Sequence, residues 1–304
     1  GIFISHGHED HIGALAYLLD YVNVPVYGSK LSIGLIKIKL KEAKFKGKAE
    51  FVEIDNETTL NFDGTGVTFF KTNHSIPGSY GISIETARGS IVYTGDFKFD
   101  QGASPLYTAD IGKMAKIGEK GVLLLLSDSA GAEMPGYLMS EMMVEENMID
   151  VFQSSKGRVI IASFASNINT IQHTMNAAFK SNRKVAIVGN EIRQITELTM
   201  QTGFLHVEED VIIPISEANK LPDREVVILI AGAKGEPISA LERMSRRAHK
   251  QVTLAPTDTV VVAASPVRGG ELSMSKAIDA LFRTGVKVVT SKRSLYVPGH
   301  GAQE

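Results

Sequence analysis

The chain has 304 residues, a formal net charge of −2 and no cysteine. This length allows one large domain or two of medium size, each with its own hydrophobic core. The lack of cysteine excludes disulfides, thiolate-bound zinc and thiol catalysis, so any metal must be held by His, Asp or Glu. The near-neutral charge gives no general sign of a nucleic-acid binder, so a polyanion would have to meet a local basic surface or metal ions.

No apolar stretch is long enough to span a membrane and no secretory signal is visible, so we expect a cytoplasmic protein with no membrane partner. Residues 1–4 have the composition of a buried strand, and residues 300–304 are typical of a loop. We therefore expect the sequence to be a fragment of a longer chain.

In the first part of the chain, short apolar segments separated by turns predict strands. The middle segments are joined by tight turns at Asp63-Gly64 and Arg88-Gly89, which favours antiparallel hairpins. Helices are expected after His11 and over residues 29–44. The expected strands cover residues 1–5, 24–27, 51–54, 67–72, 81–85, 90–94 and 122–127.

From about residue 130, long helical segments alternate with strands rich in β-branched residues. This alternation predicts a parallel sheet with crossover helices. The expected helices cover residues 140–154, 167–182, 191–201, 237–250 and 273–284, and the expected strands cover 159–162, 185–188, 226–231, 259–263 and 287–290. The predicted fold class is therefore α/β, with a second α/β unit inserted into the first.

A dense group of histidines and acids follows the first expected strand. His6, His8, Asp10 and His11 lie between this strand and the start of a helix. In such a turn, His6 and His8 can point at one cation while Asp10 and His11 point at a second. A single histidine or aspartate here would be an ordinary turn residue, but nothing in a turn requires clustered imidazoles.

His74 and Asp96, which follow two later strands, can complete this site. Asp96 is well placed beside Gly95 to bridge two cations, and His74 would complete the first. Imidazole and carboxylate ligands suit zinc or manganese. The sequence therefore predicts two divalent metal ions that activate a shared water for hydrolysis of a phosphodiester, a thioester or a lactam.

The order and spacing of these residues resemble the metallo-β-lactamase superfamily, and the later motifs narrow the resemblance to the ribonuclease J family of β-CASP nucleases. The motifs are residues 6–11, His74, Gly95-Asp96 and residues 127–129, 163–168, 235–237 and 298–301. The resemblance covers nearly the whole chain. It implies an αββα metallo-β-lactamase domain over residues 1–130 without its N-terminal strands and an inserted α/β β-CASP domain over 131–292. Residues 293–304 would return to the metallo-β-lactamase domain, which is truncated there.

The resemblance also implies roles for individual residues. One metal would be held by His6, His8 and His74, the other by Asp10 and His11, with Asp96 as the bridge. Asp10, Asp128 and His300 would be catalytic, with Asp128 orienting His300 to protonate the leaving oxygen. From residue type alone, Asp128 is a helix N-cap and His300 a loop residue at the surface. RNA or phosphate contacts are implied for Ser163, Ala165, Ser166, Asn167, Gly235, Glu236, Gly299, His300 and Gly301.

Several positions depart from the family pattern. Asn169-Thr170 stands where His-Arg is usual, Asn190-Glu191 where Arg-Ser is usual and Lys234 where Gln is usual. Tyr296 and Pro298 replace a His and a Ser of the phosphate motif. Loss of an arginine and gain of a glutamate weaken binding of a 5′-nucleotide. This pattern resembles the second, less active ribonuclease J paralogue of Firmicutes.

The leading hypothesis is a metal-dependent 5′-to-3′ exonuclease and endonuclease acting on RNA in messenger decay and ribosomal RNA maturation. Its expected partners are RNA, an RNA-degradation complex and a second subunit. This subunit is either another copy of the chain in a homodimer or a ribonuclease J paralogue in a heterodimer or tetramer. The first alternative is a weakly active or structural subunit that supports an active paralogue. The second is a small-molecule metallo-hydrolase, against which the second α/β unit argues, and a DNA-specific β-CASP nuclease fits the later motifs less well.

A basic stretch, the lysines of residues 30–48, surrounds apolar residues at helical spacing. Its members are Lys30, Lys37, Lys39, Lys41, Lys44, Lys46 and Lys48, with Glu42 among them. The ordinary interpretation is a solvated helix face, and the alternative is a contact with RNA or a partner. The same two interpretations apply to Arg243, Arg246, Arg247 and Lys250, which are expected on one helix.

Overall fold

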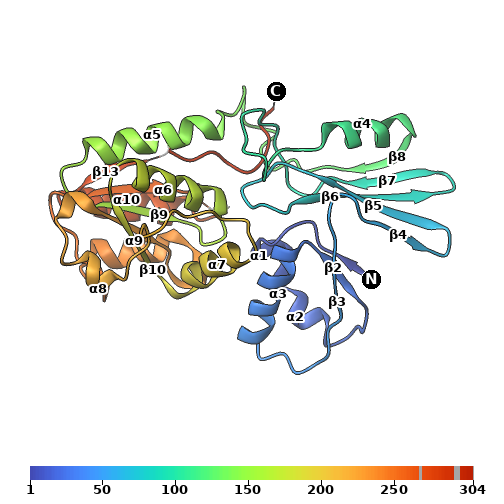
Figure 1. The fold of residues 1–304 in the computed structure, drawn as a ribbon, viewed down its shortest axis with the longest axis horizontal. Coiled ribbons are helices and arrows are strands. Elements are labelled where there is room, and N and C mark those ends of the chain that lie inside the picture. Colours follow the sequence, from blue (N-terminus) through green and yellow to red (C-terminus); the bar gives the residue numbers. More distant parts are fainter. Residues whose placement is uncertain (267–268, 291–294, 304) are drawn as a thin grey trace. The chain divides into compact units, whose positions relative to one another are not determined.

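The computed structural model describes residues 1–266, 269–290 and 295–303. The chain forms two compact units (Figure 1). Unit 1 comprises Gly1–Leu138 and Pro298–Glu304, and unit 2 comprises Met139–Val297. The expected domain boundary at residues 292–293 falls outside the described residues. No helix in the described part of the chain is both long enough and apolar enough to cross a lipid bilayer.

Unit 1 contains two sheets and the helices that flank them. Its elements are β1 (Ile2–Phe3), α1 (Glu9–Ile12), α2 (Leu15–Leu18), β2 (Val26–Gly28), α3 (Lys30–Glu42), β3 (Phe51–Glu53), β4 (Thr59–Phe62), β5 (Thr65–Lys71), β6 (Tyr80–Thr86), β7 (Gly89–Tyr93), α4 (Ile111–Glu119) and β8 (Val122–Leu126). The first sheet, β1-β2-β3, is parallel. The second runs β4-β5-β6-β7-β8, with the expected antiparallel hairpins and a parallel last pair. Neither β4 nor α4 was predicted.

The core of unit 1 lies between the two sheets. Phe3 and Tyr27 of the first sheet pack with Phe69 and Ile82 of the second, and Phe69 is fully buried. A separate cluster packs Ile117 of α4 against the second sheet. Since α3 contacts β2 and β3, a helix accompanies each sheet, and the expected αββα arrangement is confirmed.

Strand β8 differs from the other strands in its exposure. Its sequence, Val-Leu-Leu-Leu-Leu, is typical of a strand buried on both faces. All five residues are nevertheless exposed, from 41% for Val122 to 59% for Leu123, and β8 forms the edge of its sheet. An apolar edge of this kind favours pairing with further polypeptide.

Unit 2 is a parallel five-stranded sheet with crossover helices, as the sequence predicted. Its elements are α5 (Glu141–Ser154), β9 (Val159–Ser163), α6 (Ile168–Lys180), β10 (Lys184–Val188), α7 (Asn190–Gln201), α8 (Ile215–Ala218), the 3₁₀ turn Asp223–Glu225, β11 (Val226–Ile230), the 3₁₀ turn Ala233–Gly235, α9 (Pro237–Ser245), β12 (Thr259–Ala263), α10 (Glu271–Phe282) and β13 (Lys287–Val289). The strand order is β10-β11-β9-β12-β13, and every pair is parallel.

Helix α9 ends earlier than the sequence predicted. It was expected to reach residue 250, but it stops at Ser245 because Arg247 adopts a left-handed conformation with φ of 56°. The amide of Ala248 then donates to the carbonyl of Arg243, which closes the helix end. The prediction that Arg243, Arg246, Arg247 and Lys250 share one helix is therefore wrong.

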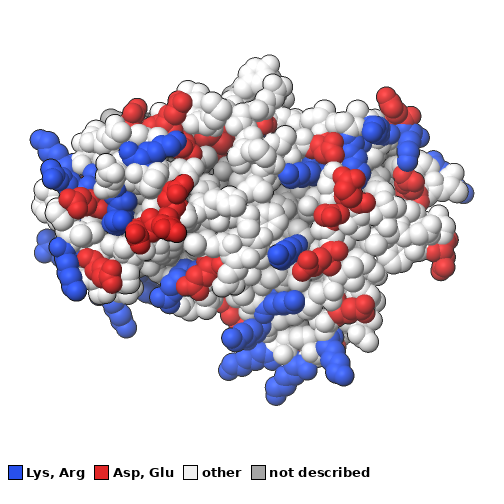
Figure 2. Space-filling model, viewed as in Figure 1, with Lys and Arg blue, Asp and Glu red and all other residues white. Residues whose placement is uncertain are grey.

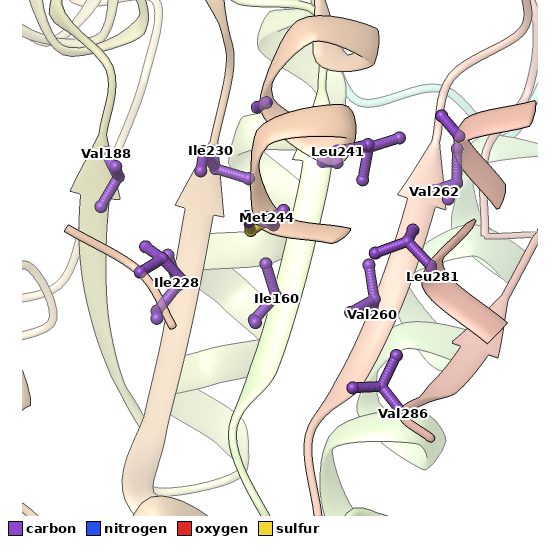
Figure 3. Close-up of a cluster of buried hydrophobic side chains, with 14 of the residues drawn as sticks. Ile160, Val188, Ile228, Ile230, Leu241, Met244, Val260, Val262, Leu281 and Val286 are labelled. Atoms are coloured by element: carbon purple, nitrogen blue, oxygen red, sulfur yellow. The ribbon is translucent and has the colours of Figure 1, made fainter. Parts of the chain in front are cut away.

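The strands of unit 2 are apolar on both faces. On one face, Ile160, Ile228 and Val260 pack against residues of α9 and α10 such as Leu241, Met244 and Leu281 (Figure 3). Alternate residues such as Ile161 and Leu229 are equally buried. Burial on both faces explains why these strands read as continuous β-branched runs rather than as alternating patterns.

A buried histidine joins α5 to α6 within unit 2. His173 lies with one ring nitrogen 3.2 Å from Glu141 and the other 3.5 Å from Glu145. Burial lowers the pKa of His173, but the hydrogen bonds to the two carboxylates outweigh it and raise the pKa above the ordinary value. The bond from His173 is in turn the main reason why the pKa of Glu145 falls to about 2, with Asn176 and Lys180 adding to it.

We expect this cluster to stabilise unit 2 most at mildly acidic pH. The Glu145 contribution is present above its unfolded pKa of 4.5 and is lost as the pH falls towards 2. The His173 contribution is present below its unfolded pKa of 6.5 and is lost as the pH rises through the raised folded value. Denaturant unfolding of His173→Gln and the wild type at several pH values should differ most between 4.5 and 6.5.

The matched control is His206→Gln, since His206 is exposed. Its unfolding free energy should follow the wild type at every pH. A His173→Gln deficit that does not change with pH would contradict the ion-pair account.

Candidate metal centre

The candidate metal ligands lie on loops that follow strands of unit 1. The segment His6–His11 begins after β1 and runs into α1, which carries Asp10 and His11, whereas His74 follows β5 and Asp96 follows β7. Gly95, with φ of 61°, turns the chain immediately before Asp96 and lies against Ser5. The helix expected after His11 is broken at Gly13 into the single turns α1 and α2.

Three histidines bring one ring nitrogen each to a common point. Nδ1 of His8 lies 3.1 Å from Nε2 of His6 and 2.9 Å from Nε2 of His74. Nitrogens bound to one tetrahedral zinc lie about 3.3 Å apart, because each Zn–N bond is about 2.0–2.1 Å. With one oxygen of Asp96, these nitrogens form a group that can hold a metal ion.

Burial keeps this group in the form that binds metal. It is the main cause of the strongly lowered pKa of His6 and of His74, and the neighbouring imidazoles lower both further. Nδ1 of His74 is directed to the carbonyl oxygen of Gly299, 2.7 Å away. A proton on Nδ1 leaves the Nε2 lone pair of His74 free for a cation.

A second group shares Asp96 with the first. Nε2 of His11 lies 3.3 Å from Oδ2 of Asp96 and 3.7 Å from Oδ2 of Asp10, and these three residues can also hold a metal ion. Burial lowers the pKa of His11, but the hydrogen bond with Asp96 and the negative charges of Asp96 and Asp10 together outweigh it and raise the pKa. Asp10 is largely exposed, so it is the most accessible residue of this group.

Asp128 and His300 form a close pair at the same place, although the two positions are far apart in the sequence. Nδ1 of His300 lies 2.8 Å from Oδ2 of Asp128, and this is the main cause of the raised pKa of His300. Asp128 also accepts hydrogen bonds from the backbone amides of Phe97 and Ala130. Nε2 of His300 lies 4.0 Å from Oδ2 of Asp96.

The residue types and their spacing fit two divalent cations. Ring nitrogens and carboxylate oxygens suit zinc and manganese alike. One oxygen of Asp96 belongs to both donor groups, as a bridging carboxylate requires. Neutral imidazoles buried this close together do not contribute to an apolar core, and without a bound metal their grouping is difficult to explain.

The sequence did not single out Ser5. Its side chain is buried, and its hydroxyl oxygen lies 3.1 Å from Nδ1 of His6 and 3.3 Å from Nδ1 of His11. The available signal was a hydroxyl residue directly before the histidine cluster at a strand end. A serine there is too common to indicate a role by itself.

The residues expected to contact RNA fall into two groups. Gly299, His300 and Gly301 lie in unit 1 beside the candidate ligands. The others lie in unit 2, at the end of β9 and on the segments that follow β9 and β11, and the amide of Ala165 donates to the carbonyl of Gly235. Asn167 is buried and caps α6 by accepting from the amide of Thr170, so its side chain has a structural task.

The other residues of this second group are Ser163, Ser166 and Glu236. Ser163 is fully buried at the end of β9. Glu236 stands at the N-terminus of α9 without a side-chain capping bond. Glu191 of α7 would lie 3.3 Å from a Cβ atom placed on Gly235, so a carboxylate adjoins this loop.

The basic stretch occupies α3 and the loop that follows it. Lys30, Lys37 and Lys41 share one side of α3, because their spacings of seven and eleven residues correspond to almost whole turns. The opposite side buries residues such as Leu35, which packs against Gly7 of the segment His6–His11. Figure 2 shows the basic side chains gathered over α3 and this loop.

The pairing of these lysines is uneven. Lys39 pairs with Glu9 at 2.9 Å and approaches Glu42 at 3.6 Å. In the described part of the chain, the other members of the stretch form no ion pair. Lys37 lies over the ring of Phe51.

Two family models match the chain. The metallo-β-lactamase superfamily model matches residues 1–127, and the model described as "Ribonuclease J, beta-CASP domain" matches residues 156–281. "Ribonuclease J2" of Bacillus subtilis (strain 168) is 46% identical over 303 residues, and "Ribonuclease J 2" of Staphylococcus saprophyticus is 40% identical over 304. Each match covers 100% of this chain but only 55% of the relative, so the chain spans about half the length of these proteins.

A solved structure of a protein of unknown function from Enterococcus faecalis V583 is also similar. It has a TM-score of 0.66 and 15% sequence identity, over 98% of this chain and 69% of that one. At this identity the likeness concerns the fold alone.

We expect Gly299→Ala to weaken metal binding by displacing His74. A Cβ atom on Gly299 would lie 2.5 Å from Cε1 and 2.6 Å from Nδ1 of His74, so the ring has to move. Zinc affinity measured with a competing chelator should fall by roughly tenfold, as for other losses of support to a ligand. Gly118→Ala in α4 is the control, since nothing lies within 4 Å of the added atom. Equal zinc affinity of Gly299→Ala and the wild type would refute this role of Gly299.

Proposed function

Because the chain belongs to the ribonuclease J family of metallo-β-lactamase and β-CASP proteins, we propose that it is the core of a metal-dependent ribonuclease. The observation that carries the proposal concerns Asp96. Its Oδ2 atom lies within 4.0 Å of a ring nitrogen of four histidines. One carboxylate oxygen thus joins both candidate metal groups to the Asp128–His300 pair.

The proposed ligands divide between two cations. His6, His8 and His74 would hold the first, Asp10 and His11 the second, and Asp96 would bridge them. Two bound divalent cations polarise a water and neutralise the charge of a phosphodiester under attack. Zinc and manganese both suit this donor set, and the matched β-CASP domain makes RNA the proposed substrate.

His300 is the proposed general acid. Its Nδ1 donates to Asp128, so an added proton resides on Nε2, the ring nitrogen that faces Asp96. From there it can pass to the 3′ oxygen that leaves when the phosphodiester is hydrolysed. Asp128 holds the ring in this orientation and, by its negative charge, favours the protonated imidazolium.

The basic side of α3 supports a polyanionic substrate. The buried side of this helix packs against the segment His6–His11. Most of its lysines have no carboxylate partner among the described residues. Charges of this kind attract a phosphate backbone without reading its sequence.

We propose exonuclease and endonuclease activity in messenger decay and ribosomal RNA maturation, in a complex with a paralogous subunit.

A structural or weakly active subunit is the second candidate, and Glu191 favours it. Its carboxylate adjoins the Gly235 loop, where a phosphate contact was expected, so it would repel a 5′-phosphate. Asn169 and Thr170, which replace the usual His-Arg, are buried and add no charge. Two similar proteins are named "Ribonuclease J2" and "Ribonuclease J 2", which is consistent with the second paralogue and so with this candidate.

The test uses the full-length protein, RNA with a 5′-monophosphate and added manganese. We expect the wild type to cleave this RNA and Asp96→Asn to abolish cleavage, because both donor groups lose the shared carboxylate. Asp20→Asn, at an exposed aspartate of the same unit, should cleave normally. If Asp96→Asn cleaves as the wild type does, the two-metal proposal fails. If only a complex with the paralogue is active and it tolerates Asp96→Asn, the structural-subunit candidate is correct.

A salt titration tests the contribution of the basic stretch. The triple variant Lys41→Gln, Lys46→Gln, Lys48→Gln should bind single-stranded RNA more weakly, measured by fluorescence anisotropy. The slope of log affinity against log salt should become shallower by about 2, since each lost contact with single-stranded nucleic acid accounts for about 0.7.

The control for this variant removes three lysines that are exposed on unit 2, by the changes Lys220→Gln, Lys276→Gln and Lys287→Gln. It has the same net charge as the first triple variant. If both variants change the slope equally, only the total charge matters and the basic stretch has no special contact with RNA.

A further inference from the structure

One buried hydroxyl lies between histidines of both candidate metal groups. Ser5 is 3% exposed, and its Oγ lies 3.1 Å from Nδ1 of His6 and 3.3 Å from Nδ1 of His11. His6 belongs to the group with His8 and His74, whereas His11 belongs to the group with Asp10. Among the described residues, Ser5 is therefore placed to act on ligands of both metals at once.

The backbone holds this hydroxyl in place. The carbonyl of Ser5 accepts a hydrogen bond from the amide of Tyr80, and the amide of the preceding Ile4 donates to Tyr27. Gly95 approaches so closely that a Cβ atom there would lie 3.0 Å from the Cβ of Ser5. Ser5 is thus fixed between the first sheet and the turn that carries Asp96.

The far side of each ring determines which nitrogen must carry the proton. Nε2 of His6 lies 3.6 Å and Nε2 of His11 lies 3.3 Å from the same oxygen of Asp96. A neutral imidazole has only one N–H group, so Nε2 offers a lone pair to a cation only when the proton is on Nδ1. In both rings, Nδ1 is the nitrogen that faces Ser5.

A serine hydroxyl can satisfy both rings together. Its oxygen has two lone pairs, so it can accept from Nδ1–H of His6 and from Nδ1–H of His11. Its own proton is then not needed by either ring. If the hydroxyl instead donated to either Nδ1, that histidine would carry its proton on Nε2 and could not bind a cation there.

We propose that Ser5 is a positioning residue for both metals: by accepting from Nδ1–H of His6 and of His11, it holds both rings in the tautomer that presents Nε2 to a cation. This inference rests on the proposed metal ligands and does not depend on RNA as the substrate. Loss of the hydroxyl leaves the buried N–H group of His6 and the partly buried N–H group of His11 without this acceptor and releases both rings. Both sites should therefore weaken together.

The first experiment titrates metal-free full-length protein with zinc against a competing chelator. The wild type should bind two ions, and Ser5→Ala should bind both roughly 10- to 100-fold more weakly, the range expected for loss of support to a ligand. Ser5→Thr keeps the hydroxyl and should restore the affinity. Ser79→Ala is the control, because Ser79 is a buried serine of the same unit whose hydroxyl donates to the carbonyl of Ile76.

The second experiment reads the tautomers directly. Long-range ¹H–¹⁵N correlation of the histidine rings in metal-free protein should give Nδ1–H for His6 and His11 in the wild type. In metal-free Ser5→Ala, at least one of these rings should change tautomer or exchange between the two forms. Thermal unfolding of each variant separates this effect from a general loss of structure.

Three results would overturn the proposal. One is zinc affinity of Ser5→Ala within twofold of the wild type at both sites, and another is Nε2–H on either ring in the wild type. The third is weakening that Ser5→Thr fails to relieve although the variant unfolds at the wild-type temperature. None of these measurements uses RNA, so a failure of the ribonuclease proposal in the cleavage assay is distinguishable from a failure of this one.

Discussion

The shared oxygen of Asp96 is the constraint on which the rest of unit 1 depends. Four imidazoles approach it, and at least two of them are too deeply buried to carry charge by themselves. Neutral buried rings such as those of His6 and His74 leave lone pairs that have no donor, which is costly in a buried place. Divalent cations remove this cost, so the arrangement is best understood as a site built for metal.

The fold creates this site by bringing strand ends together. β1 belongs to one sheet of unit 1 and β5 and β7 to the other, and the loops after all three meet at Asp96. Close approaches by Gly95 to Ser5 and by Gly299 to His74 leave no room for side chains. Backbone packing therefore determines the positions of the ligands as much as the ligands' own hydrogen bonds do.

The two units use different means of stabilisation. Unit 2 depends on strands buried on both faces and on the bridge formed by His173 between α5 and α6. Unit 1 has its apolar cluster between its two sheets and carries its candidate metal ligands at the ends of strands.

Local sequence was sufficient for much of the fold and for the candidate ligands. The strands and the longer helices of unit 2 were predicted because each has a strong period or a β-branched run that depends little on its neighbours, whereas the single turn α8 was not predicted. The helix expected to reach residue 250 was too long, because a left-handed residue at Arg247 has no clear signal in the sequence. The candidate ligands stood out because His6, His8, Asp10 and His11 are crowded into one turn.

Other features depended on tertiary contacts. The pairing of Asp128 with His300 joins positions 172 residues apart, and only the resemblance to a family suggested it in advance. Ser5 could not be singled out, because a serine at a strand end acquires its role only from the two rings that fold around it.

The sequence by itself determined the α/β class, the absence of thiol chemistry and a turn rich in metal-binding side chains. Only the tertiary structure decided that one oxygen of Asp96 serves both donor groups and that one hydroxyl faces both rings. The physical reason is range: periodicity and residue type act over a few neighbours along the chain. Hydrogen-bond partners, burial and the resulting pKa shifts arise from segments that meet only in the folded state.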